Sequence, residues 1–159
     1  RRRMVWHANA SPTYKWAKWS DGTSGWTAKP TEELLDLLVA WDNSNYLMCA
    51  SSHIESSDSK HVEGIVQSHE YSLIRVVKDV AASGVSLLQL RNPWGRKEWH
   101  GPWCDESAEW KMHPDICQVL EHRPGDDGLF WMAIEDFARI YDTVCVLELE
   151  MPHKQAARP

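Results

Sequence analysis

Two runs of strand-forming residues are separated by a short turn in the middle of the chain. Residues 64–77 predict a long strand, residues 79–84 a turn, and residues 85–90 a returning strand rich in Val and Leu. The returning strand ends in the sequence RNPWG at residues 91–95. This hairpin predicts an antiparallel sheet at the centre of the fold.

The segments on either side of the hairpin add further strands and a few short helices. The apolar spacing after Pro30 predicts a helix that ends at residues 43–45. Further predicted elements are strands at residues 46–50, 129–133 and 143–150, a surface loop at 51–60, and helical turns at 106–110, 114–120 and 135–141. The expected fold class is therefore α+β, mainly antiparallel β.

The length and net charge of the chain limit the number of domains and the kinds of partner that it can have. A chain of 159 residues fits one domain with its own core. Its net charge of −6 disfavours binding to nucleic acid, and no stretch approaches the ~20 apolar residues of a membrane span. The predicted organisation is an irregular Trp-rich segment at residues 1–30, the main domain at 31–150 and a tail at 151–159.

Four cysteines bear on the cellular compartment: Cys49, Cys104, Cys117 and Cys145. They show neither CxxC pairs nor the dense spacing of a disulfide-rich scaffold. This pattern favours a reducing compartment, so the cytoplasm is the expected location. The chain does not begin with Met, which suggests a fragment or a processed piece of a longer protein.

His69, Asn92 and Trp94 are the candidate catalytic residues. Neighbouring strands lie ~4.8 Å apart, so His69 on the first strand and Asn92 after the second are expected to be neighbours. An amide that bonds one imidazole nitrogen fixes the ring while the other nitrogen faces a nucleophile. Trp94 can cover this pair with an apolar face. A strand histidine with a local hydrogen bond is the plainer interpretation of His69 taken alone.

Four consecutive motifs resemble the catalytic core of the calpain family in both order and spacing. They are GIVQSHEYSL at residues 64–73, LQLRNPWG at 88–95, EWHGPWCDESAEW at 98–110 and DGLFWM at 127–132. The resemblance implies the C-terminal, β-barrel-like subdomain of a papain-like cysteine protease, the subdomain that carries the catalytic histidine and asparagine.

The resemblance also implies a role for each candidate residue. His69 corresponds to the general base of calpains, Asn92 to the residue that orients it, and Trp94 to the aromatic ring that shields both. The catalytic cysteine of calpains lies in a separate helical subdomain earlier in the chain, which would be a partner here beside protein substrates. The expected function is half of an intracellular, calcium-dependent cysteine endopeptidase that is inactive alone.

Calpains also bind Ca²⁺ in this subdomain, through acidic side chains and a backbone carbonyl. Glu98, Asp105 and Asp127 match the ligand positions of the family, whereas Leu129 replaces an acidic residue. Carboxylates are the oxygen ligands that Ca²⁺ prefers. The resemblance therefore implies an incomplete Ca²⁺ site, and solvated loop carboxylates are the alternative.

Departures beside the histidine leave other functions open. Relatives usually carry Gly-His-Ala where this chain has Ser68, His69 and Glu70. A serine is strained if the backbone at position 68 has a positive φ, whereas strand alternation turns Glu70 away from His69. These departures favour an alternative, a calpain-like pseudoprotease that acts as a regulatory or binding module. A peptide or carbohydrate binder is a third possibility, which rests only on the ten Trp.

Overall fold

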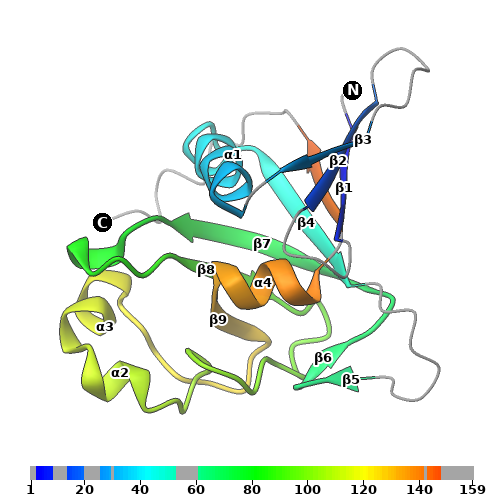
Figure 1. Cartoon of the computed structure of the whole chain (residues 1–159). Helices are drawn as coiled ribbons and strands as arrows, with labels where there is room; N and C mark the ends of the chain where they lie inside the picture. Colours follow the sequence, from blue (N-terminus) through cyan, green and yellow to red (C-terminus); the bar gives the residue numbers. More distant parts are fainter. Residues whose placement is uncertain are drawn as a thin grey trace.

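A five-stranded antiparallel sheet forms the centre of the computed structural model (Figure 1). The structure describes residues 3–8, 14–19, 26–29, 31–52, 61–141 and 143–147, and it describes side chains from residue 31 onward except at 61 and 62. The strands lie in the order β10 (Thr143–Leu147), β4 (Leu47–Ser52), β7 (His69–Val77), β8 (Leu87–Arg91) and β9 (Leu129–Ala133). The predicted α+β fold of mainly antiparallel strands is confirmed.

The predicted hairpin is the β7–β8 pair in the middle of this sheet. Leu73 lies opposite Leu90, and the register shifts by one residue between Leu73 and Arg75. The turn between the strands contains the short 3₁₀ helix η1 (Val80–Ala82). The hairpin therefore holds the start of β7 beside the end of β8.

The first predicted strand of the hairpin is interrupted near its start. The short strand β6 (Ile65–Val66) ends before Ser68, whose backbone is left-handed with a φ of 51°, and β7 begins at His69. A left-handed residue redirects the chain, so β6 does not continue into β7. It pairs instead with β5 (His61–Val62) in a separate two-stranded ribbon.

Two helices, α1 (Thr31–Asn43) and α4 (Ile134–Ile140), lie on one side of the sheet (Figure 1). Leu34 of α1 and Phe137 of α4 are completely buried with Leu90 of β8 in the main core. The helix predicted after Pro30 is thus confirmed. None of the helices within the described residues is long and apolar enough to cross a membrane.

Strand alternation divides the middle of the sheet between two cores. Leu88 joins the main core, whereas Leu87 and Trp131 contribute to a second cluster, because successive side chains of a strand point to opposite faces. The helices α2 (Glu109–Met112) and α3 (Pro114–Leu120) contribute Trp110, Ile116 and Leu120 to the second cluster, and Val80 and Trp103 complete it. The long Trp-rich connection between β8 and β9 is therefore packed structure, as its predicted helical turns suggested.

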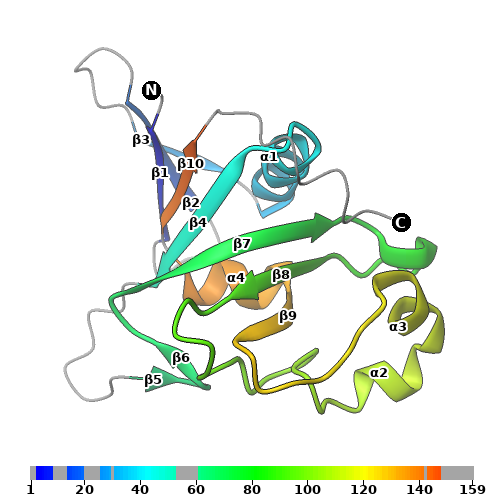
Figure 2. The ribbon, with the colours of Figure 1, turned by 180° about the vertical axis from the view of Figure 1, so that it is seen from behind.

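A second antiparallel sheet lies in the N-terminal segment, where the sequence predicted irregular structure. It consists of β1 (Arg3–Ala8), β2 (Tyr14–Trp19) and β3 (Trp26–Lys29), in this order. Strand β1 lies beside β10 (Figure 2). These strands are held together by backbone pairing. No regular spacing of apolar residues along any one of them predicts a strand from the sequence. Residues 53–60 of the predicted surface loop and the tail at 151–159 lie outside the described residues.

Candidate active site

His69 and Asn92 meet where two neighbouring strands begin and end. His69 is the first residue of β7, and Asn92 directly follows the last residue of β8. Because these strands are antiparallel, the start of one lies beside the end of the other. The Nε2 atom of His69 lies 3.0 Å from the Oδ1 atom of Asn92, which is hydrogen-bonding distance.

Two further hydrogen bonds determine which way the Asn92 amide faces. The backbone N–H of Trp94 donates to Oδ1 over 3.1 Å, and Nδ2 donates to the carbonyl oxygen of Lys97 over 3.0 Å. An N–H group cannot accept and a carbonyl cannot donate, so exchanging Oδ1 and Nδ2 would break both bonds. Asn92 is completely buried, which makes such a loss costly. Oδ1 is therefore the atom that faces His69.

The orientation of Asn92 selects one tautomer of the neutral His69 ring. Oδ1 accepts hydrogen bonds and cannot donate them, so the hydrogen-bond network assigns the ring proton to Nε2. The Nδ1 atom then carries the free lone pair. It is the atom of His69 that can take a proton from a nucleophile.

Two aromatic rings flank the imidazole. The Trp94 ring lies 4.2 Å from it between centroids at a tilt of 35°, and the Tyr71 ring meets it edge-on at 5.0 Å. Tyr71 is completely buried, and its hydroxyl accepts the backbone N–H of Val66 over 2.9 Å. Trp94 is 51% exposed. Tyr71 is thus the buried neighbour of the imidazole, and the half-exposed Trp94 ring covers it on the solvent side.

The Asp-Gly turn before β9 supports the loop that carries Asn92. The backbone N–H of Asn92 donates to the carbonyl oxygen of Gly128 over 2.8 Å. Gly128 has a φ of +85°, and a Cβ atom at this position would lie 2.6 Å from the Asn92 carbonyl oxygen. A side chain at position 128 would therefore push away the backbone on which Asn92 stands.

The two residues beside His69 behave differently from each other. Ser68 has a φ of 51°, and its backbone N–H donates to the carbonyl oxygen of Ser52 over 2.7 Å. This conformation costs a residue with a Cβ atom about 1–2 kcal/mol. Glu70 lies on the other face of β7, where its Oε1 atom is 3.4 Å from the Ser51 hydroxyl oxygen. The strain at Ser68 therefore adjoins His69, whereas the Glu70 carboxylate points away from it.

We expect Ser68→Gly to raise the free energy of unfolding by up to about 1 kcal/mol, because glycine adopts a positive φ without a steric penalty. Urea denaturation of both proteins measures the change. Ser72→Gly is the matched control, since Ser72 lies within the regular part of β7, where glycine destabilises by roughly 0.5–1 kcal/mol. Equal effects of the two substitutions would show that position 68 is not strained.

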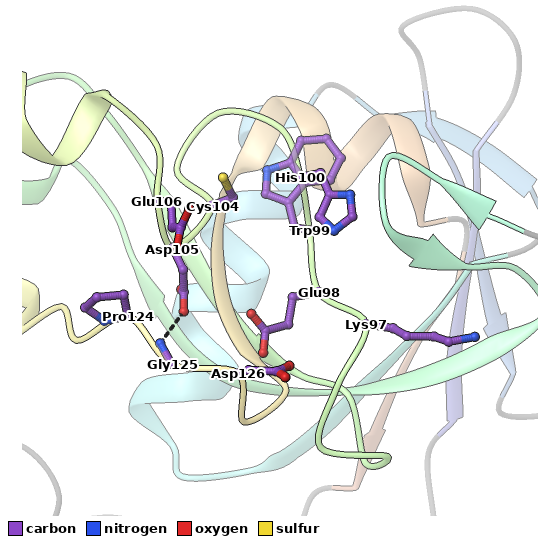
Figure 3. A pocket seen from close by; sticks show the side chains of 10 residues that line it. All are labelled: Lys97, Glu98, Trp99, His100, Cys104, Asp105, Glu106, Pro124, Gly125 and Asp126. Atoms are coloured by element: carbon purple, nitrogen blue, oxygen red, sulfur yellow. Dashed lines mark hydrogen bonds between the residues drawn. The ribbon is translucent and has the colours of Figure 1, made fainter.

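Two carboxylates link the loop after β8 to the loop before β9, close to His69 and Asn92. Oε1 of Glu98 accepts the backbone N–H of Asp127 over 3.1 Å and that of Gly128 over 2.7 Å. Oδ2 of Asp105 accepts the backbone N–H of Gly125 over 2.7 Å, a bond drawn in Figure 3. These bonds fix the Asp-Gly turn, which in turn supports Asn92.

A pocket of about 590 Å³ opens between the same loops (Figure 3). Burial raises the pKa of Glu98, and the charges of Asp105 and Asp126 raise it further. Burial and the charge of Asp127 likewise raise the pKa of Asp105. The carboxylates therefore repel one another electrostatically when they are ionised. The residues that line the pocket are Lys97, Glu98, Trp99, His100, Cys104, Asp105, Glu106, Pro124, Gly125 and Asp126.

The carboxylates have the chemistry for Ca²⁺ but lack its geometry. One oxygen each of Glu98, Asp105 and Asp127 already accepts a backbone N–H. Within the described part of the chain, no three acidic, His or Cys side chains converge into a group that could hold a metal ion. Leu129, at the position where the resemblance to calpains implies an acidic ligand, has no side-chain oxygen. The three predicted ligands thus lie in two facing loops without forming a preformed site.

We expect Glu98→Gln to stabilise the fold near neutral pH and to lose this advantage in acid. A carboxyl group whose pKa is raised on folding destabilises the folded state when it is ionised, and the loss disappears as protonation replaces the charge. Glutamine keeps the oxygen that accepts the two backbone N–H groups. Thermal unfolding near neutral pH and below about pH 4 measures the difference. The exposed Glu135→Gln is the control, and an equal gain at both pH values would contradict the explanation.

The four cysteines all lie within the described residues, away from the imidazole of His69. The Sγ atom of Cys49 lies 3.9 Å from Oε2 of Glu70, on the opposite face of the sheet from His69, and Cys145 lies opposite Cys49 on β10. Cys104 packs against the main core and Cys117 against the second cluster. Among the described residues, no hydrogen bond or ring contact joins any of these four side chains to His69 or Asn92.

Comparison with known proteins places these features in a family. The sequence model of a protein family described as calpain family cysteine protease matches residues 13–148 of the chain. The chain is 36% identical to calpain-9 of Rattus norvegicus over 123 residues, which is 74% of the chain and 18% of that protein. It is 38% identical to calpain clp-1 of Caenorhabditis elegans over 96 residues, which is 58% of the chain and 12% of that protein. The chain belongs to the calpain family, and it spans less than a fifth of the length of these relatives.

Sequence reasoning named His69, Asn92 and Trp94, and the structure brings these three side chains together. It missed Lys97, which acts through its backbone carbonyl, a group that residue type does not reveal. It also missed Tyr71, although strand alternation places Tyr71 on the same face as His69 and could have identified it.

Proposed function

We propose that this chain is the His/Asn half of the catalytic core of a calpain-like cysteine endopeptidase. The observation that carries the proposal is the 3.0 Å contact of His69 Nε2 with Asn92 Oδ1, in an amide that can face only one way. This arrangement leaves Nδ1 of His69 available to a nucleophile, as in cysteine proteases that use a Cys-His-Asn set. Membership of the calpain family supports the same reaction.

His69 would act through Nδ1. A thiol within hydrogen-bond reach of Nδ1 gives its proton to the ring, and the thiolate then attacks the carbonyl carbon of a peptide bond. The imidazolium donates from Nε2 to Asn92, and its Nδ1 proton passes to the departing amine. Asn92 stays neutral throughout and holds the plane of the imidazole ring. Trp94 limits the access of water to the hydrogen bond between His69 and Asn92.

The nucleophile in this proposal comes from an upstream subdomain that carries the catalytic cysteine, as the resemblance to calpains implies. The parent protein cleaves protein substrates in the cytoplasm, consistent with four free cysteines, and the present chain alone is inactive. Acyl transfer needs the thiol and the base within hydrogen-bond reach, and no cysteine of this chain adjoins His69 in the described residues.

A chimera tests this proposal. Residues 31–147 replace the matching segment of rat calpain-9, which is 36% identical to this chain, and hydrolysis of a fluorogenic peptide is measured. We expect hydrolysis by the chimera and none by the chain alone. A folded chimera without hydrolysis, beside an active rat calpain-9, would argue against the protease function.

A calpain-like pseudoprotease is the second candidate function, and the strain at Ser68 favours it. A left-handed serine next to the base is a cost that an active enzyme would avoid with glycine. Two results discriminate between the candidates. Restoration of hydrolysis by Ser68→Gly in an inactive chimera, or a Ser or Gly in place of the nucleophile in the parent protein, would support the pseudoprotease.

We propose that Glu98, Asp105 and Asp127 bind Ca²⁺ no more tightly than the millimolar range, because their carboxylates do not converge. Calorimetric titration of the chain with Ca²⁺ measures the affinity, and Asp105→Ala is the control. A micromolar dissociation constant that Asp105→Ala abolishes would show that the two loops close around the ion. Absence of heat at millimolar Ca²⁺ would remove the three residues from the list of ligands.

A further inference from the structure

Cys49 and Cys145 face each other across two neighbouring antiparallel strands. Cys49 lies on β4 and Cys145 on β10, and the two are direct partners in the register of this pair. Directly opposite residues project to the same face of a sheet, with Cα atoms about 4.5 or 5.5 Å apart according to the pair type. Both separations fall within the roughly 4.4–6.8 Å that a disulfide spans. The backbone therefore suits a disulfide without rearrangement.

The two thiols also interact with each other. The side chains of Cys49 and Cys145 share a hydrogen bond, and both residues are half-buried, so a small oxidant can reach them. Burial and, to a smaller extent, the neighbouring Cys145 and Glu70 together raise the pKa of the Cys49 thiol to about 12. Cys49 therefore keeps its proton near neutral pH, and the first attack on an oxidant is assigned to its strand partner, Cys145.

We propose that Cys49 and Cys145 form a cross-strand dithiol that a peroxide oxidises to a disulfide. Neither residue takes part in the proposed protease chemistry, so this site is independent of it. The oxidant is named by its class, a hydroperoxide such as hydrogen peroxide.

The reaction balances in two steps. The thiolate of Cys145 attacks one peroxide oxygen, so that an S–O bond forms, the O–O bond breaks and a water molecule leaves after protonation. The sulfur of Cys49 then attacks the sulfenic acid, so that the S–S bond forms, the S–O bond breaks and a second water leaves. Two thiols are oxidised, and one hydrogen peroxide molecule is reduced to two water molecules.

Cys104 and Cys117 provide an internal comparison. Cys104 packs against the main core and Cys117 against the second cluster, so the two lie in different parts of the molecule. Burial raises the pKa of Cys104, and the charges of Asp105 and Glu109 raise it further. Neither residue is the strand partner of another cysteine in the registers described.

The proposed disulfide would link an outer strand of the sheet to its interior. β10 lies at one edge, and β4 lies between β10 and β7, which begins with His69 (Figure 2). The link closes a loop that runs from residue 49 to residue 145, and a loop of this length strongly restricts the unfolded chain. We therefore expect oxidation to raise the melting temperature and dithiothreitol to reverse the rise.

Peptide mapping of the wild-type chain tests the proposal. The protein is treated with hydrogen peroxide, its remaining thiols are alkylated, and its peptides are identified by mass spectrometry. We expect the peptides of Cys49 and Cys145 to be joined with the loss of two hydrogen atoms, and Cys104 and Cys117 to be alkylated. Alkylation or sulfinic acid at both Cys49 and Cys145, or a disulfide to another cysteine, would overturn the proposal.

Two serine variants extend the test to stability. Cys145→Ser should abolish the rise in melting temperature on oxidation, whereas Cys117→Ser should keep it. A rise that persists in Cys145→Ser would overturn the proposed link. The mapping of the wild-type chain decides the matter if Cys145→Ser does not fold.

Discussion

His69→Ala in the chimera with rat calpain-9 should lower kcat/KM by about 10²–10⁴-fold, the usual contribution of a general base. The substitution removes the only group in the described site that is placed to accept a thiol proton, Nδ1, while the buried amide of Asn92 keeps its bonds to Trp94 and Lys97. The fold should therefore survive while hydrolysis fails. Steady-state rates with a fluorogenic peptide measure the effect.

His113→Ala is the matched control for this experiment. His113 contacts the ring of Trp103 in the second cluster, away from His69, so hydrolysis should continue at nearly the original rate. Circular dichroism should show that both variants are folded. Similar rates for the chimera and its His69→Ala variant would mean that His69 is not the base.

Asn92→Ala should lower hydrolysis by about 10²-fold, because the imidazole loses the group that fixes its plane. It should also destabilise the fold by about 1–3 kcal/mol, since the backbone N–H of Trp94 and the carbonyl of Lys97 lose their partner. The two effects have one structural origin, the buried amide. Peptide hydrolysis measures the first, and urea denaturation of the chain measures the second.

The neighbouring Arg91→Ala is the control for Asn92, because Arg91 is the last residue of β8 and its side chain is exposed. A surface change of this kind usually alters stability by no more than about 0.5 kcal/mol. Equal destabilisation by Asn92→Ala and Arg91→Ala would contradict the structural role assigned to the amide.

Local patterns predicted the fold where side chains follow a regular period. The apolar face of α1 and the Val- and Leu-rich runs of β7 and β8 were identified correctly, because burial on one face requires that spacing. The strand predicted at residues 64–77 was continuous, so the break at Ser68 was not predicted, although a positive φ at this position had been considered. The sheet of β1–β3 was also missed, because pairing between strands leaves no clear period in one strand.

The candidate site was predictable only in part, for a similar reason. Side-chain chemistry and strand spacing led to His69 and Asn92, but the hydrogen bonds that orient the amide come from the backbone of Trp94 and Lys97. Such groups are identical in every residue, and only folding places them. The carboxylates Glu98 and Asp105 were named as metal ligands, and the structure shows them bonded to backbone N–H groups of the facing loop.

The orientation of Asn92 is the basis of the proposed chemistry, and the tautomer of His69 tests it most directly. Long-range nitrogen–proton correlation spectra of the chain, recorded at a pH where the imidazole is neutral, show which ring nitrogen carries the proton. The geometry predicts a proton on Nε2 and a lone pair on Nδ1. A proton that resides mainly on Nδ1 would contradict the role of His69 as a base oriented by Asn92.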